Sequence, residues 1–301
     1  MSGDTEVILK TRRTFHERSN AQISLFLSTA YLLTILSGCS STTVDNGNDS
    51  TLETVPLSNL ATSDAANPRT PVTLDLTNAT TIFLSGSSAT IDGDGAQVDD
   101  GVVTITQGGI YAVSGTLAEG RILVNAAEAD VIVALSGASI TCSYGSPLYI
   151  YQAGTATVHL VEGTENVLTD GESYTFADSL SSPADEEPNA CLYSKADMVI
   201  EGAGALTVAA NYKNGITSKD TLTIYDGTVT VSAVNHGVNG KDSNTIDSAT
   251  LTVTCGGDAI RSTNDTDNSL GWVSVSNTAL FLNSGEDGIQ AETWAAVSSG
   301  A

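Results

Sequence analysis

Oxygen-bearing side chains gather in the last third of this sequence, where together they could hold a metal ion. The set consists of Asp258, Asn264, Asp265, Asp267 and Asp287. Calcium binds about six to eight oxygen atoms of carboxylates and carbonyl groups, and a bound calcium ion could bridge to the carboxylate of an acidic sugar. The competing interpretation is that Asp and Asn occur here because they tolerate the backbone geometry of turns. The sequence leaves both interpretations open.

Three basic side chains near this set could bind an anionic polymer. Lys219 and Lys241 lie 22 residues apart, and Arg261 comes three residues after Asp258. Each lysine is followed by an aspartate, so mutual neutralisation on a solvated face is the simpler interpretation for the lysines. Arg261 would lie directly beside the predicted metal.

Aromatic side chains could bind sugars by stacking on pyranose rings. Tyr144 and Tyr174 belong to a tyrosine-rich region, and Trp272 and Trp294 lie about one repeat apart. The alternative is that such tyrosines cover the core and keep a hydrated hydroxyl. Glycoside hydrolysis also stays open, because it needs only two carboxylates about 5–9 Å apart. A serine triad has no support, since the sequence contains no Gly-x-Ser-x-Gly turn.

A repeat in the sequence must position these side chains. Four phrases recur, beginning at Asn214, His236, Asp258 and Asp287, and the first three are spaced by 22 residues. Self-similarity at this period is typical of a solenoid, in which each repeat buries its apolar face on its neighbours. Three apolar ladders are predicted: Ile216, Val238, Ile260 and Ile289; Ile224, Ile246 and Val275; and Val231, Val253 and Leu282. Together with the many short β-branched runs, they predict an all-β, right-handed parallel β-helix with coils of about 22 residues.

The N-terminal region predicts export. Residues 1–38 combine basic residues with a short apolar stretch, as in a signal peptide. The ending Leu36-Ser37-Gly38-Cys39 resembles the lipobox of bacterial lipoproteins, and this resemblance implies that Cys39 carries a lipid that anchors the chain to a membrane. Residues 39–70 are rich in Ser, Thr, Asn and Asp and predict a disordered tether. Residues 71–301 form the predicted β-helix domain, and Cys142, Cys191 and Cys255 are predicted to fill its core.

The charge balance excludes one class of partner. The chain has 11 Lys and Arg residues against 35 Asp and Glu residues, a formal net charge of −24. Nucleic-acid binding depends on neutralising phosphates with Lys and Arg, so nucleic acid is not expected as a partner. The acidity is explained either by solubility of an exported protein or by calcium binding.

Several segments resemble a bacterial carbohydrate-binding family whose type member is a clostridial protein that binds cellulose and acidic sugars. They include Asn214–Asp220, Gly257–Asp265 and Gly285–Glu292, within a resemblance that covers roughly residues 80–295. It implies a β-helix similar to that of pectate lyases, bound calcium, and binding of a polysaccharide such as polygalacturonate. Because members of the family continue for further coils and no cap follows Asp287-Gly288-Ile289, we expect the sequence to be truncated at its C-terminus.

These observations predict a surface lipoprotein that binds polysaccharide without cleaving it. Asp258, Asn264, Asp265, Asp267 and Asp287 are the predicted metal ligands, and Lys219, Lys241 and Arg261 the predicted sugar-binding residues. One alternative is a calcium-dependent lyase of the pectate type, in which calcium acidifies the uronate α-proton and a basic residue removes it. The other is a structural or adhesive β-helix with no sugar site.

Overall fold

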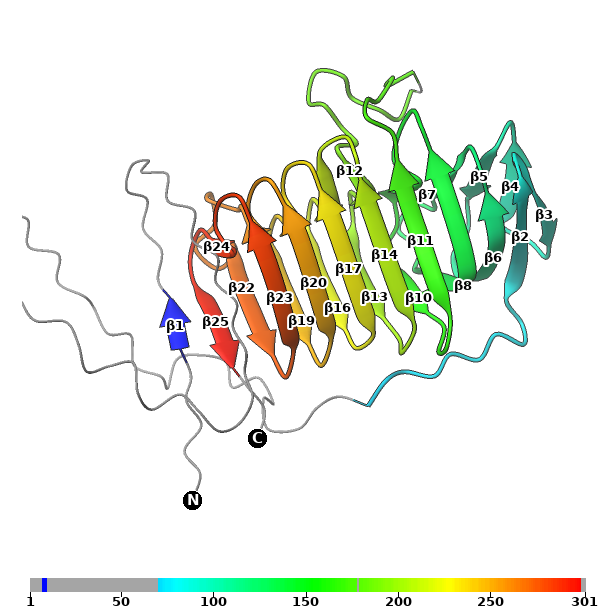
Figure 1. Ribbon diagram of the computed structural model, residues 1–301. Helices are drawn as coiled ribbons and strands as arrows, with labels where there is room; N and C mark the ends of the chain where they lie inside the picture. Colours follow the sequence, from blue (N-terminus) through cyan, green and yellow to red (C-terminus); the bar gives the residue numbers. More distant parts are fainter. Residues whose placement is uncertain (1–6, 10–69, 178, 299–301) are drawn as a thin grey trace, which may run out of the picture.

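The chain winds into a parallel β-solenoid of about eight turns (Figure 1). The structure is a computed structural model that describes residues 7–9, 70–177 and 179–298, and these residues contain no helix. The prediction of an all-β parallel solenoid is therefore confirmed.

Three faces run along the solenoid, and each of the regular coils between residues 155 and 291 contributes one strand to each face. The strands of the first face are β2 (Thr80–Gly86), β6 (Gly109–Leu117), β8 (Val131–Cys142), β10 (Thr155–Leu160), β13 (Asp197–Glu201), β16 (Thr221–Tyr225), β19 (Ser243–Asp247), β22 (Trp272–Ser276) and β25 (Ala295–Ser298), with β3 (Ser88–Asp92) paired to β2. The second face continues with β11 (Glu165–Asp170), β14 (Ala205–Ala210), β17 (Thr228–Ala233), β20 (Thr250–Cys255) and β23 (Ala279–Ser284). The third face consists of β4 (Ala96–Asp99), β5 (Val102–Ile105), β7 (Arg121–Asn125), β9 (Leu148–Gln152), β12 (Ala190–Ser194), β15 (Asn214–Ser218), β18 (Val238–Gly240), β21 (Ile260–Ser262) and β24 (Ile289–Ala291).

Hydrogen bonding joins the first two faces into one sheet. The twelve residues of β8 are long enough to turn the corner, so β8 pairs with β10 through its first half and with β11 through its second half. The third face is a separate nine-stranded sheet, which we call the third sheet. Its strands follow one another in chain order with parallel pairing, apart from the antiparallel pair β4 and β5. Equivalent residues of successive coils therefore lie side by side.

The interior consists of the predicted ladders. On the third sheet Ile216 pairs with Val238, Val238 with Ile260, and Ile260 with Ile289. The ladders of the other two faces show the predicted registers as well. Their side chains belong to one apolar core that runs along the solenoid, so every coil buries its apolar residues against the next. Cys142, Cys191 and Cys255 are buried free thiols, as predicted.

A corner that repeats in three coils explains how the first face turns into the second. Asp226, Ser248 and Asn277 have φ values of 60°, 58° and 49°, in the left-handed region that Asp and Asn adopt more readily than other non-glycine residues. The amide of Asp226 donates to Asp247 O, and the amide of Ser248 donates to Ser276 O. The corners thus stack in register along the solenoid.

The insertion between β11 and β12, residues 171–189, interrupts this regular winding. It rises above the coils near β12 in Figure 1 and packs on the outer side of the third sheet. There Leu123, Tyr149 and Tyr193 are buried with Leu180 of the insertion against them, and Tyr149 Oη donates to Leu180 O at 2.8 Å. The insertion is thus a surface loop that covers part of a sheet.

The predicted N-terminal features lie mostly outside the described residues. These include Cys39 and nearly all of residues 1–70. Within the predicted signal peptide only β1 (Val7–Leu9) is described, and it pairs antiparallel with β25. A search of the described part of the chain for a helix long and apolar enough to cross a membrane finds none.

Candidate carbohydrate-binding surface

The outward side chains of the third sheet form a polar strip along the last coils. Because side chains alternate along a strand, the residue after each core isoleucine, leucine or valine points outward. The resulting outer column consists of Tyr193, Thr217, Asn239, Arg261 and Gln290, which are paired in successive strands. Two further columns flank it: the turn column of Asn214, His236, Asp258 and Asp287, and the lysine column of Lys195, Lys219 and Lys241. These three columns make up the polar strip.

Two buried side chains of the outer column have polar atoms without a partner. Thr217 is only 2 % exposed and Asn239 only 7 % exposed. No hydrogen-bond partner lies near Thr217 Oγ1 or Asn239 Oδ1, and the same holds for Nε of Arg261. A buried polar atom without a partner is unfavourable by about 1–3 kcal/mol, and native proteins contain few such atoms. Partnerless polar atoms in three successive coils, at Thr217, Asn239 and Arg261, indicate a surface that a polar ligand would complete.

The lysines of the column stack as their spacing predicts. Lys195 and Lys219, however, form ion pairs with a glutamate instead of with the aspartates that follow them in sequence. The amide of Lys219 donates to Ser194 O, and the amide of Lys241 donates to Ser218 O, one coil apart. Glu187 of the insertion receives both Lys195 Nζ at 3.2 Å and Lys219 Nζ at 2.5 Å. The aspartates that follow these lysines in sequence are therefore not their closest acidic partners. Lys241 is exposed at the next position of the column.

The turn column links successive coils through side-chain acceptors. Asn214 Oδ1 accepts the amide N–H of His236 at 3.2 Å, His236 Nδ1 accepts that of Asp258 at 2.9 Å, and Asp258 Oδ1 accepts that of Asp287 at 3.1 Å. Each side chain thus satisfies the backbone of the equivalent residue in the next coil. This regularity supports the interpretation that the position is occupied by turn-forming acceptors, whatever their charge.

A group of possible metal ligands also lies in this column. One ligand atom from each of His236, Asp258 and Glu286 lies within 4.8 Å of the others. His236 Nδ1 is 3.3 Å from Asp258 Oδ2, and Arg261 Nη1 is 3.9 Å from the same oxygen. Of the predicted ligands this group includes only Asp258. His236 shares a coil position with Asp258, which is the signal that could have found it, whereas nothing in the sequence marks Glu286.

These donors fit calcium poorly. Calcium takes oxygen ligands, whereas an imidazole nitrogen suits borderline ions such as zinc, and the nearby Arg261 guanidinium disfavours any cation. Burial alone would raise the pKa of Asp258, but its contact with His236, the hydrogen bond from the Asp287 amide and the charge of Arg261 hold it below its ordinary value. Asp287 shows the opposite shift, because burial and the charges of Asp258 and Glu286 raise its pKa.

Three of the other predicted ligands, Asn264, Asp265 and Asp267, lie in the turn between β21 and β22. Asn264 Oδ1 accepts hydrogen bonds from the amide and hydroxyl of Thr266 and from the amide of Asp267. Asp267 Oδ1 accepts the amide and hydroxyl of Ser269. Asp265 is exposed in the same turn. Because Asn264 Oδ1 and Asp267 Oδ1 accept hydrogen bonds within the turn, turn geometry explains why Asn and Asp occur at these positions.

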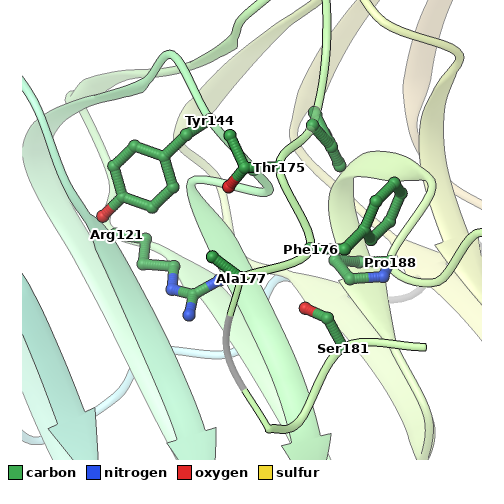
Figure 2. Close-up of a pocket in the computed structure, with 9 residues that line it drawn as sticks. Arg121, Tyr144, Thr175, Phe176, Ala177, Ser181 and Pro188 are labelled. Carbon is green, nitrogen blue, oxygen red and sulfur yellow. The ribbon is translucent and has the colours of Figure 1, made fainter. Parts of the chain in front are cut away.

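Aromatic side chains line a separate pocket beside the insertion. Figure 2 shows Arg121 and Tyr144 facing the insertion across a cavity of about 200 Å³. Its lining consists of Arg121, Tyr144, Gly145, Tyr174, Thr175, Phe176, Ala177, Ser181 and Pro188. Trp272 and Trp294 stack near the other end of the solenoid, with ring centroids 5.0 Å apart and planes 2° from parallel. Both places offer flat faces of the kind on which sugar rings stack.

Comparison with known proteins decides the family. Residues 99–301 match the sequence profile of a family described as "Carbohydrate-binding domain-containing protein". The chain is a member of this family. A carbohydrate-binding domain-containing protein of Acetivibrio thermocellus is 39% identical over 185 residues, which are 61% of this chain and 63% of that protein. The chain thus spans less than two thirds of the length of that relative.

The carbohydrate-binding domain also resembles a solved structure. This is a gadolinium derivative of the polysaccharide lyase-like protein from C. thermocellum, 34% identical, with a TM-score of 0.67. The match covers 72% of this chain and 96% of that one. The resemblance deduced from the sequence is thereby confirmed at the level of family and fold.

Proposed function

We propose that this domain binds polysaccharide along the polar strip of the third sheet without cleaving it. The ligand classes that we propose are cellulose and acidic polymers such as polygalacturonate. The observation that carries the proposal is the row of outward polar side chains that Thr217, Asn239 and Arg261 form in successive coils of a member of a carbohydrate-binding family. Within this row Thr217 Oγ1 and Asn239 Oδ1 have no partner inside the protein.

A polysaccharide matches this row in chemistry and in repeat. Sugar hydroxyls both donate and accept, so one class of group can serve the hydroxyl of Thr217, the amide oxygen of Asn239 and the guanidinium Nε of Arg261. Successive strands lie about 4.8 Å apart, which is close to the length of one pyranose unit in an extended chain. A polymer lying along the solenoid axis would therefore present one sugar to each coil. Lys241, exposed beside Asn239, would bind a carboxylate where the sugar carries one.

Binding without cleavage agrees with the state of Arg261. An arginine side chain stays protonated near neutral pH, and the carboxylate of Asp258 lies 3.9 Å from its Nη1. A protonated, ion-paired guanidinium orients an anion but is a poor general base. The C. thermocellum relative is a polysaccharide lyase-like protein, so lyase activity is the alternative to be measured.

Assistance by calcium is a separate part of the proposal. The gadolinium derivative of the relative and the stacked carboxylates of Asp258 and Asp287 favour a hard cation, whereas the imidazole of His236 in the same group favours a borderline ion. His236, Asp258 and Glu286 would hold the ion, and the bound ion would fix the side chains of the turn column. Glycan binding measured after the ion is removed and replaced with calcium or zinc would therefore identify the ion.

We also propose that the domain acts outside the cytoplasm. Residues 1–38 would direct export, Cys39 would carry the lipid anchor, and residues 39–70 would tether the β-helix to the membrane, facing the cell exterior or the periplasm. Labelling of the expressed chain with a radioactive or alkyne-tagged fatty acid, compared with Cys39→Ser, tests this part. Equal labelling of the two proteins would exclude Cys39 as the lipidated residue.

The central experiment measures binding to polygalacturonate and to insoluble cellulose, with and without a chelator. Absorbance of unsaturated uronides is followed in the same samples. We expect retention on at least one glycan and no unsaturated product. Retention that survives chelation removes the cation from the mechanism, and recovery with zinc but not calcium identifies a borderline ion. Unsaturated product would favour a lyase, and no retention on either glycan would favour an adhesive or structural role.

A further inference from the structure

The insertion brings one carboxylate onto the lysine column. Glu187, only 9 % exposed, receives Lys195 Nζ at 3.2 Å and Lys219 Nζ at 2.5 Å. Burial alone would raise the pKa of Glu187, but the hydrogen bonds from the two lysines outweigh it and lower the pKa below its ordinary value. The carboxylate is therefore charged at neutral pH, and it bridges two successive coils.

The surrounding contacts hold Glu187 in this place. Its amide donates to Ser182 O at 2.9 Å, and the amide of Ser182 donates to Glu187 O at 2.7 Å. Tyr149 Oη holds the same insertion at Leu180 O, and Lys213 Nζ pairs with Glu186 at 2.5 Å. The insertion thus covers part of the third sheet. Glu187 contacts two lysines of the lysine column, whereas Glu186 contacts Lys213.

The contact shows how the lysine column receives an anion. Two ammonium groups from neighbouring coils converge on a single carboxylate, and the column continues past this pair to Lys241. The outer column continues in parallel from Tyr193, beside Glu187, to Thr217 and Asn239. The polar strip is therefore already filled by a carboxylate of the protein at one end. Among the described residues Lys241 forms no such close ion pair, and Asp220 interacts with it only at longer range.

We propose that Glu187 acts as an internal competitor that closes one end of the strip. It neutralises Lys195 and Lys219, so a ligand that follows the strip from Arg261 meets a protein carboxylate at the coil of β15. Glu187 would thereby limit how many sugar units bind and would lower the affinity for chains that carry carboxylates at those positions. This inference rests on the proposed function, because it concerns the same strip.

The test compares Glu187→Gln with Glu186→Gln. Both substitutions remove one negative charge from the same insertion, but Glu186 pairs with Lys213 outside the lysine column. Affinities are measured for oligogalacturonides of increasing length and for neutral cello-oligosaccharides. For Glu187→Gln we expect affinity for the longer oligogalacturonides to rise about threefold, the scale of one or two partly exposed ion pairs. We also expect the affinity to reach its plateau at a longer oligomer than in the parent chain. Glu186→Gln should leave both properties unchanged.

A double variant separates freed lysines from a loosened insertion. In Glu187→Gln combined with Lys195→Met, the gain should shrink, because one of the two released ammonium groups is missing. If the full gain in affinity persists, a loosened insertion explains it and the proposal is overturned. Equal affinities of Glu187→Gln, Glu186→Gln and the parent chain would overturn it as well, provided that thermal unfolding shows all three to be folded. If even the parent chain binds no glycan, the proposed function itself fails.

Discussion

Replacing Thr217 with valine should change stability and binding in opposite directions. The two side chains have nearly the same shape, and both are β-branched, so the strand preference of β15 is kept. The substitution removes Oγ1, which is buried and has no hydrogen-bond partner. An unsatisfied buried polar group destabilises a fold by about 1–3 kcal/mol. We therefore expect the free energy of unfolding to rise by about 1 kcal/mol, the lower end of that range.

The same substitution should weaken glycan binding. A neutral hydrogen bond contributes about 0.5–1.5 kcal/mol net, so affinity should fall by about two- to tenfold. Urea denaturation of the free protein measures the first effect, and titration with polygalacturonate or cello-oligosaccharides measures the second. Thr223→Val is the matched control, because Thr223 is also largely buried, on β16 of the first face, and its hydroxyl is not among the partnerless atoms.

A single outcome would refute the reasoning. If Thr217→Val lowers the unfolding free energy and leaves glycan affinity unchanged, then Oγ1 makes a stabilising contact within the protein and does not face a ligand. In that case the outer column would be an ordinary part of the sheet surface, and the proposed site would lose its main support.

Three further predictions address the strip, its turn and the core. Lys241→Met should weaken binding of polygalacturonate more than binding of cellulose and reduce its salt dependence, whereas Lys213→Met should not; equal losses in the two variants would indicate a general charge effect. The folded-state pKa of Asp258 lies below the unfolded value, so its ionisation stabilises the fold above a pH of about 4 and this contribution disappears as the pH falls through the folded-state pKa. Asp258→Asn should therefore destabilise the protein at pH 7 by about 1–2 kcal/mol and progressively less in acid, and a pH-independent difference in unfolding free energy would contradict this. Ile260→Ala should lower the unfolding free energy by about 2–5 kcal/mol, because Ile260 is fully buried in the middle of a ladder; a loss below 1 kcal/mol in urea denaturation would contradict continuous packing of the core.

The sequence predicted the interior well because the interior is periodic. Ile216, Val238 and Ile260 recur at a constant spacing, and a solenoid converts this spacing directly into contact. The lysine column followed from the same rule. The coils before residue 180 lack this regular spacing, since β6 and β8 each continue around a corner that later coils divide between two strands.

The site was predicted less completely because it depends on contacts that do not repeat. Glu187 reaches Lys195 and Lys219 from an insertion, and no periodicity places an insertion over a particular coil. Whether Thr217 Oγ1 has a hydrogen-bond partner likewise depends on residues outside the repeat that pack over it. The residue types of Asn264 and Asp267 suggested metal ligands, but the structure uses one side-chain oxygen of each within a turn.

The turn column has a consequence for how such a protein can change over generations. Asn214, His236 and Asp258 perform the same task of accepting the next coil's amide, although one is an amide, one an imidazole and one a carboxylate. Exchange among these residue types preserves the hydrogen bond that joins the coils. The charge along this edge can therefore differ from coil to coil while the same hydrogen bond is kept, and new ligand preferences can be acquired one coil at a time on an unchanged backbone.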